Sequence, residues 1–278
     1  MTADILEFLS YGFIQRALIA GCFVALACSL LGVLLVLRRL SLIGDGLSHV
    51  TFGSVAVGLF MNVYPLYVSL PIVMASALGI LRLTERARIY GDAAIGIVSS
   101  VGIAAGVMLA SVAGGLNVDL FSYLFGNVLS ISSTEVYASI LLSIVVVGAV
   151  ALYFDELFSI TFDEEYARAS GIQTARINAV LVLLTAITVV LTMKVVGIML
   201  TSALLILPAA TAFQVARGFR NSMLIAAGTS VVSVVSGIVI SFAFNLPTGA
   251  SIVLLNFVIF LAALLLKSLF RPRPARPQ

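Results

Sequence analysis

The chain has 278 residues, of which 62% are hydrophobic and 10% are charged, and its mean hydropathy is +1.21. This composition excludes an ordinary soluble globular domain and predicts an all-α protein that crosses a membrane many times. The net charge of +3 comes with no basic patch that carries interleaved aromatic residues, so no nucleic-acid partner is expected.

Nine segments are apolar over the roughly 20 residues that a helix needs to cross the hydrocarbon core of a bilayer. The first fifteen residues contain no lysine or arginine, so no cleavable signal peptide is expected and the first span should remain as an anchor. We expect membrane-spanning helices at 17–37, 47–63, 65–81, 93–113, 135–153, 177–195, 197–216, 222–244 and 248–267.

The basic residues predict how these spans are oriented, because cytoplasmic loops are enriched in lysine and arginine. With the N-terminus outside and the C-terminus in the cytoplasm, 13 of the 15 basic residues lie on the cytoplasmic side and only Arg16 and Lys194 do not. The opposite orientation would invert this ratio. We therefore expect a multi-pass membrane protein, with one transmembrane domain over 1–270 and a disordered cytoplasmic tail at 271–278.

The stretch GDGLSHVTFG, Gly44 to Gly53, lies at the head of the second span and contains the only histidine of the chain, His49, four residues after Asp45. This spacing puts a carboxylate and an imidazole on one face of a helix. Unpaired charge in lipid is costly, and groups of this kind inside a membrane usually have a function. A structural alternative stays open, in which Asp45 caps the start of the helix and His49 bonds to a neighbouring helix.

Three later segments also stand out. In the fourth span, Gly102 and Gly106 form a small-xxx-small pair that suits close helix contact. The exterior stretch from Leu120 to Ile131 is too polar to span and too apolar for a loop, so we expect a re-entrant or surface-lying helix that serves as a gate or simply packs over the mouth. The long cytoplasmic segment at 154–176 should contain a short helix that ends at Ser170-Gly171.

Common catalytic and nucleotide-binding motifs are missing from the sequence. There is no GxxxxGK[ST] phosphate loop, since the two lysines follow Met193 and Leu266, and no CxxC, HExxH or nucleophile-elbow motif occurs. We therefore expect no enzymatic activity and no permanently bound cofactor in this chain. A pathway for a transported substrate is the remaining interpretation.

The sequence resembles the membrane permease subunits of bacterial ATP-binding-cassette importers for zinc, manganese and iron. Four stretches carry the resemblance, in matching order and spacing over most of the chain: RRLSLIGDGLSHVTFGSVAVG, LFGNVLSIS, FDEEYARASGI and VGIMLTSALLILPAATA. Each stretch alone is a weak signal. Their coincidence is specific.

The resemblance implies a fold of the vitamin B12 importer (type II) kind, used as a homodimer with the ion pathway on the two-fold axis. It implies that Asp45 and His49 are metal ligands, and that Ala169, Ser170 and Gly171 form the turn of a coupling helix. The implied partners are a second copy, a cytoplasmic ATPase dimer that binds ATP, an extracellular or periplasmic metal-binding protein, and membrane lipid.

Two alternatives remain from the sequence. A secondary ion-coupled transporter would also be polytopic, but it should show repeated halves with interrupted helices, and no convincing repeat is seen. A permease for iron chelates would share the fold, but it normally has another span and needs no intramembrane ligand pair. The sequence does not choose between zinc, manganese and iron, because aspartate and histidine bind all three.

Overall fold

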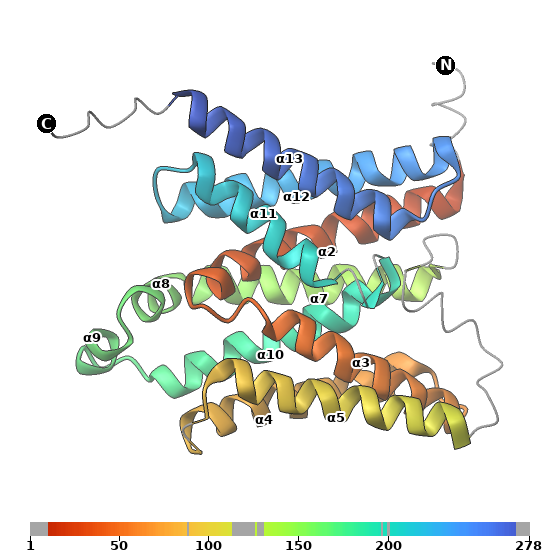
Figure 1. Ribbon diagram of the computed structural model, residues 1–278, viewed down its shortest axis with the longest axis horizontal. Coiled ribbons are helices and arrows are strands. Elements are labelled where there is room, and N and C mark those ends of the chain that lie inside the picture. Colours follow the sequence, from red (N-terminus) through yellow and green to blue (C-terminus); the bar gives the residue numbers. More distant parts are fainter. Residues whose placement is uncertain are drawn as a thin grey trace, which may run out of the picture.

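The computed structural model describes residues 11–87, 89–112, 126, 131–195, 197–198 and 201–270. Within these ranges the regular secondary structure is helical and no strand occurs (Figure 1). The tail at 271–278 and most of the segment expected to form a surface-lying helix, Leu120 to Ile131, lie outside the described residues. The helices are α2 (Gly12–Leu37), α3 (Ile43–Phe60), α4 (Pro65–Glu85), α5 (Gly91–Val112), α7 (Ser133–Leu152), α8 (Phe154–Phe162), α9 (Glu164–Ala169), α10 (Thr174–Val195), α11 (Thr201–Val215), α12 (Phe219–Phe244) and α13 (Thr248–Phe270).

Each of the nine expected spans coincides with a helix, and the polytopic all-α architecture is confirmed. Seven of these helices are long and apolar enough to cross a membrane: α2, α4, α5, α7, α10, α12 and α13. The other two differ from the seven. Helix α11 has only 15 residues, and α3 carries Asp45 and His49 within its 18 residues. Helix α3 begins at Ile43 instead of 47.

The long helices lie alongside one another, and α8 and α9 lie at one end of the bundle, at the left of Figure 1. Helices α3 and α11 begin part-way along the bundle, not at its ends (Figure 1). Their first turns meet there, because a Cβ atom placed on Gly44 would lie 2.6 Å from Leu205 Cδ1 and 3.9 Å from Ser202 Cα. The start of α3 is therefore inside the bundle.

The turn between α2 and α3 explains why α3 starts at this depth. Arg39 adopts a positive φ of 58°. Its N–H donates to the carbonyl of Val36 at 3.1 Å, and the N–H of Leu40 donates to the carbonyl of Leu35 at 2.8 Å. This pair of bonds is the Schellman arrangement that ends helices. It stops α2 at Leu37 and turns the chain back into the bundle.

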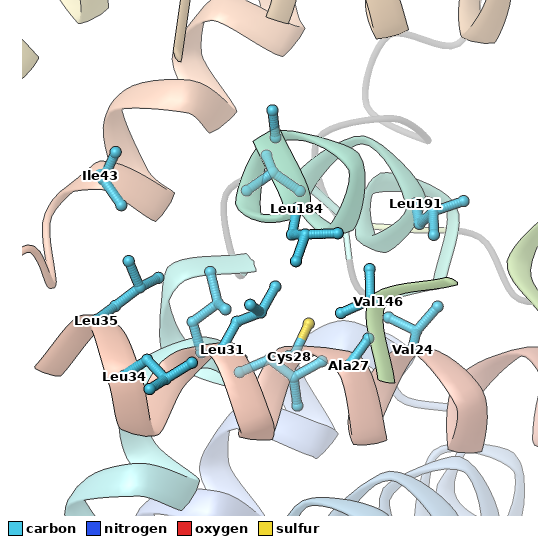
Figure 2. Close-up of a cluster of buried hydrophobic side chains, with 14 of the residues drawn as sticks. Val24, Ala27, Cys28, Leu31, Leu34, Leu35, Ile43, Val146, Leu184 and Leu191 are labelled. Carbon is cyan, nitrogen blue, oxygen red and sulfur yellow. The ribbon is translucent and has the colours of Figure 1, made fainter. Parts of the chain in front are cut away.

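Helix α2 forms the centre of the hydrophobic core. Its buried side chains line one face of a cluster that also contains residues of α7 and α10 (Figure 2). Close packing of this kind orders the interior because each side chain leaves its neighbours no room for other rotamers. Figure 2 labels Val24, Ala27, Cys28, Leu31, Leu34, Leu35, Ile43, Val146, Leu184 and Leu191.

Helices α3 and α5 approach closely through glycine. A Cβ atom on Gly102 would lie 2.7 Å from the Cα of Val50, and one on Gly106 would lie 2.9 Å from the Cα of Gly53. The close contact expected for the Gly102 and Gly106 pair is therefore confirmed. Because α5 holds α3 on this side, it also fixes the position of the Asp45 and His49 backbone.

Candidate functional site

Asp45 lies in the first turn of α3, but it does not cap the helix. The N-cap residue is Leu42, and no side chain donates or accepts a capping hydrogen bond there. The capping alternative for Asp45 is therefore wrong. The carboxylate still benefits from its place in the first turn, because the positive end of a helix dipole favours negative charge.

Asp45 and His49 lie next to each other on one face of α3. Asp45 Oδ2 is 3.6 Å from His49 Nε2, which is longer than a good hydrogen bond. Neither side chain hydrogen-bonds any other residue in the part of the chain that the structure describes. The Asp45 side chain is 50% exposed and the His49 side chain is 24% exposed. Both groups are thus accessible to a third partner.

The pair lies on a narrow open stripe of an otherwise enclosed helix. From Ile43 to Phe52, every residue of α3 is buried except Asp45, His49 and Phe52. Gly44 faces α11, and Gly46 faces α5, where an added Cβ would meet Ile95. Since successive helical residues are about 100° apart, Asp45 points between these two contacts. The stripe therefore faces the outside of the single chain between α5 and α11.

One carboxylate and one imidazole make only part of a metal site. Zinc sites in proteins generally have four ligands, and manganese takes carboxylate, imidazole and water ligands in larger numbers. No cluster of three or more His, Cys, Asp or Glu side chains that could hold a metal occurs among the described residues. Within the described parts of the chain, a single copy therefore brings together only two side chains of these types at this position.

The second predicted site is the end of α9, and its expected helix stop is confirmed. Gly171 has a φ of +90°, its N–H donates to the Arg168 carbonyl at 3.1 Å, and the N–H of Ile172 donates to the Ala167 carbonyl at 3.0 Å. This is again a Schellman ending. At the other end, the Asp163 side chain accepts a hydrogen bond from the backbone N–H of Tyr166 at 2.9 Å.

Helix α9 is anchored on one side and exposed on the other. Ala167 is fully buried against the bundle. Ala169, Ser170 and Gly171 are exposed, and α9 lies at the extreme end of the molecule (Figure 1). The three residues therefore form a small knob that another protein can reach.

Sequence reasoning missed an ion pair beside this knob. Arg38 Nη2 lies 3.3 Å from Glu164 Oε2, although the two residues are 126 positions apart. Asn178, a polar residue at the start of α10, hydrogen-bonds both Glu164 and Glu85. The only signal in the sequence was an amide side chain at the edge of an apolar span.

Comparison with known proteins places the chain in a family. The sequence model of the ABC 3 transport family matches residues 10–267, which is nearly the whole chain. The chain belongs to the ABC 3 transport family. Members of this family are membrane transport subunits, so the polytopic architecture described above is that of an ABC permease.

Individual relatives match most of the chain. The manganese transport system membrane protein MntC of Listeria innocua is 35% identical over 92% of this chain and 91% of its own length. The high-affinity zinc uptake system membrane protein ZnuB of Haemophilus influenzae is 31% identical over 89% and 95%. A solved structure of PsaBC from Streptococcus pneumoniae in complex with Fab matches with a TM-score of 0.84 and 30% identity, covering 95% of both chains. The expected permease fold is therefore confirmed.

Proposed function

We propose that this chain is the transmembrane subunit of an ATP-driven importer for divalent transition metal ions, and that Asp45 and His49 bind the ion on its path. The observation that carries the proposal is the placement of this pair on the open stripe of α3, which begins part-way along the bundle. The names of the relatives support manganese or zinc as the substrate, and iron remains compatible with the ligand types.

The ion pathway in this proposal is formed by two copies of the chain. One copy offers two ligands, so a two-fold axis beside the stripe would bring together two Asp45 carboxylates and two His49 imidazoles. A divalent ion with two carboxylates is formally neutral, which lowers the cost of holding it in a low-dielectric interior. Four ligands of mixed hardness also allow release, which a transport site requires.

The proposed partners are inferred from the missing nucleotide-binding motif and from the exposed position of α9. Without a phosphate loop, ATP hydrolysis belongs to a separate cytoplasmic ATPase, which docks on the knob at Ala169, Ser170 and Gly171. An external metal-binding protein delivers the ion at the opposite end of the bundle. The excess of basic residues at the α8–α9 end supports a cytoplasmic position for that end, with the N-terminus outside.

The proposed mechanism is alternating access. The external protein releases the ion toward the Asp45 and His49 pair while the pathway is open to the outside. Closure of the ATPase dimer on ATP then displaces α9 and the helices attached to it, so that the pathway closes outside and opens inside. The metal is the substrate of this cycle and leaves the site in each turnover.

The experiment that tests this function measures ATP hydrolysis by the reconstituted complex in the presence of the external protein. Manganese, zinc or iron(II) should stimulate the rate several-fold over the metal-free complex, and the transported ion should stimulate most. Calcium and magnesium, which prefer all-oxygen sites, serve as controls. Equal rates with and without every transition metal would contradict the proposal.

The knob can be tested separately. Replacing exposed Ser170 with tryptophan should weaken co-purification of the ATPase by at least about tenfold, equivalent to roughly 1.4 kcal/mol. The reason is that the large indole ring does not fit a cleft on the ATPase that accepts small residues. Ser170 has a φ of −78°, so this change avoids the strain that a substitution at Gly171 would add. Ser268→Trp, at an exposed serine near the end of α13, is the matched control. Unchanged ATPase binding by Ser170→Trp would rule out the docking role.

A further inference from the structure

A cluster of charged and polar side chains joins four helices at the α8–α9 end of the bundle. Arg38, at the C-cap of α2, contacts Glu164, the first residue of α9, at 3.3 Å. The Nδ2 of Asn178, on α10, donates to Glu164 Oε1 at 3.2 Å and to Glu85 Oε1 at 3.4 Å. Glu85 is the last residue of α4.

This cluster differs from an ordinary surface ion pair because Arg38 and Asn178 are largely enclosed, while the Glu164 side chain is 37% exposed. The Arg38 side chain is 11% exposed and Asn178 is 5% exposed. Burial lowers the pKa of the Arg38 guanidinium, while the negative charges of Glu164 and Glu85 raise it in opposition. Opposite charges attract more strongly where water is largely excluded than they do at an open surface. The contact should therefore hold its members firmly.

Arg38 is in turn rigidly connected to the start of α3. Its own N–H bonds the Leu34 carbonyl at 3.1 Å, and the Schellman pair follows directly after it. The N–H of Ile43 then donates to the carbonyl of Leu40 at 3.0 Å, which holds the end of the turn to the start of α3. Asp45 lies only seven positions after Arg38. A displacement of Arg38 is therefore transmitted to the first turn of α3.

Glu164 also has a second partner on its own helix. Arg168 Nη2 lies 3.5 Å from Glu164 Oε1, and the Arg168 side chain is 71% exposed. If α9 moves away from α2, Glu164 keeps Arg168 as a counter-ion and Arg38 keeps Glu85 nearby. The contact can thus open without leaving an isolated charge, which is the property that a reversible link requires.

We propose that Arg38, Glu164 and Asn178 form a latch through which movement of α9 is passed to the α2–α3 turn and so to Asp45. Arg38 and Glu164 are positioning residues in this scheme and do not contact the ion. The inference rests on the proposed function for its role in transport, but the physical link between α9 and α2 can be tested without it.

The first test uses the purified chain alone and limited digestion with trypsin after Arg168 or Arg176. Arg38→Gln and Glu164→Gln should each speed this cleavage at least fivefold, because α9 is no longer held to α2. Arg38→Lys, which keeps the charge, should restore slow cleavage. The controls are Arg39→Gln and Glu165→Gln, which alter the exposed neighbouring residues of the same types. Cleavage of Arg38→Gln and Glu164→Gln at the control rate would overturn the latch.

The second test measures metal ions transported per ATP hydrolysed in the reconstituted complex. The two latch variants should lower this ratio several-fold relative to Arg39→Gln and Glu165→Gln, with metal binding to the detergent-solubilised complex within about twofold of the unaltered protein. An unchanged ratio would overturn the transmission role. If the unaltered complex transports no metal, that result counts against the proposed function, and the trypsin comparison decides the latch on its own.

Discussion

Substitution of either Asp45 or His49 by alanine is expected to abolish metal uptake. In the proposed dimer, each change would remove two of the four proposed ligands, because both copies would carry it. Loss of a group that only orients a ligand already weakens metal sites 10- to 100-fold, so loss of two ligands should lower uptake by more than about 100-fold. Uptake of radioactive manganese or zinc by intact cells measures the effect.

The control for this prediction lies on the same turn of α3. Ser48 is buried and its hydroxyl donates to the carbonyl of Gly44 at 2.7 Å, so its side chain is turned away from the open stripe. Ser48→Ala should transport nearly normally. Co-purification of the ATPase with all three variants would show that they assemble. Normal uptake by both Asp45→Ala and His49→Ala would eliminate the site.

The second large effect is expected at the contact between α3 and α5. In Gly102→Leu, the new Cβ would lie 2.7 Å from the backbone Cα of Val50, which cannot move without shifting all of α3. Overpacking costs about 1–3 kcal/mol and occasionally more, which corresponds to a fall in Tm of roughly 2–12 °C for a chain of this size. Thermal unfolding of the detergent-solubilised protein, followed by a thiol-reactive dye or by light scattering, measures it.

The same helix supplies the matched control for this change. A Cβ atom on Gly96 meets nothing within 4 Å. Gly96→Leu should therefore leave the Tm close to that of the unaltered protein. Equal melting temperatures for the two variants would show that close approach of α3 and α5 does not support the fold.

Most of the architecture could be predicted from the sequence because its determinants are local. The apolar segments are long enough to be recognised by length, and the end of α9 is set by a glycine with positive φ at 171, which is the usual sequence signal for a helix stop. The proximity of Asp45 and His49 follows from helical periodicity alone. These features require no knowledge of the rest of the fold.

The depth of α3 in the bundle could not be predicted in this way. The helix stop before it uses Arg39 in a left-handed conformation, and arginine is not a residue that signals such a turn. The expected second span therefore began at 47, after Asp45, whereas α3 begins at Ile43. In the structure, the first turn of α3 meets Ser202 and Leu205 of α11 inside the bundle.

The polar cluster at the α8–α9 end was missed for a different reason. Arg38 and Glu164 are 126 residues apart, and each on its own is typical of a solvated helix end. Only the packing of α2, α4, α9 and α10 encloses them. A pairing that depends on tertiary burial leaves no periodic pattern in the sequence.

The central claim is that two chains share one metal ion between two Asp45 and His49 pairs. The most direct test is titration of the purified chain with manganese or zinc by isothermal calorimetry, which gives the number of ions bound per chain. The measured molar mass of the protein shows whether the chain is a dimer under the same conditions. The account predicts one ion for every two chains, and no measurable binding at this site in Asp45→Ala or His49→Ala. One ion for each chain, or binding that both substitutions leave unchanged, would contradict it.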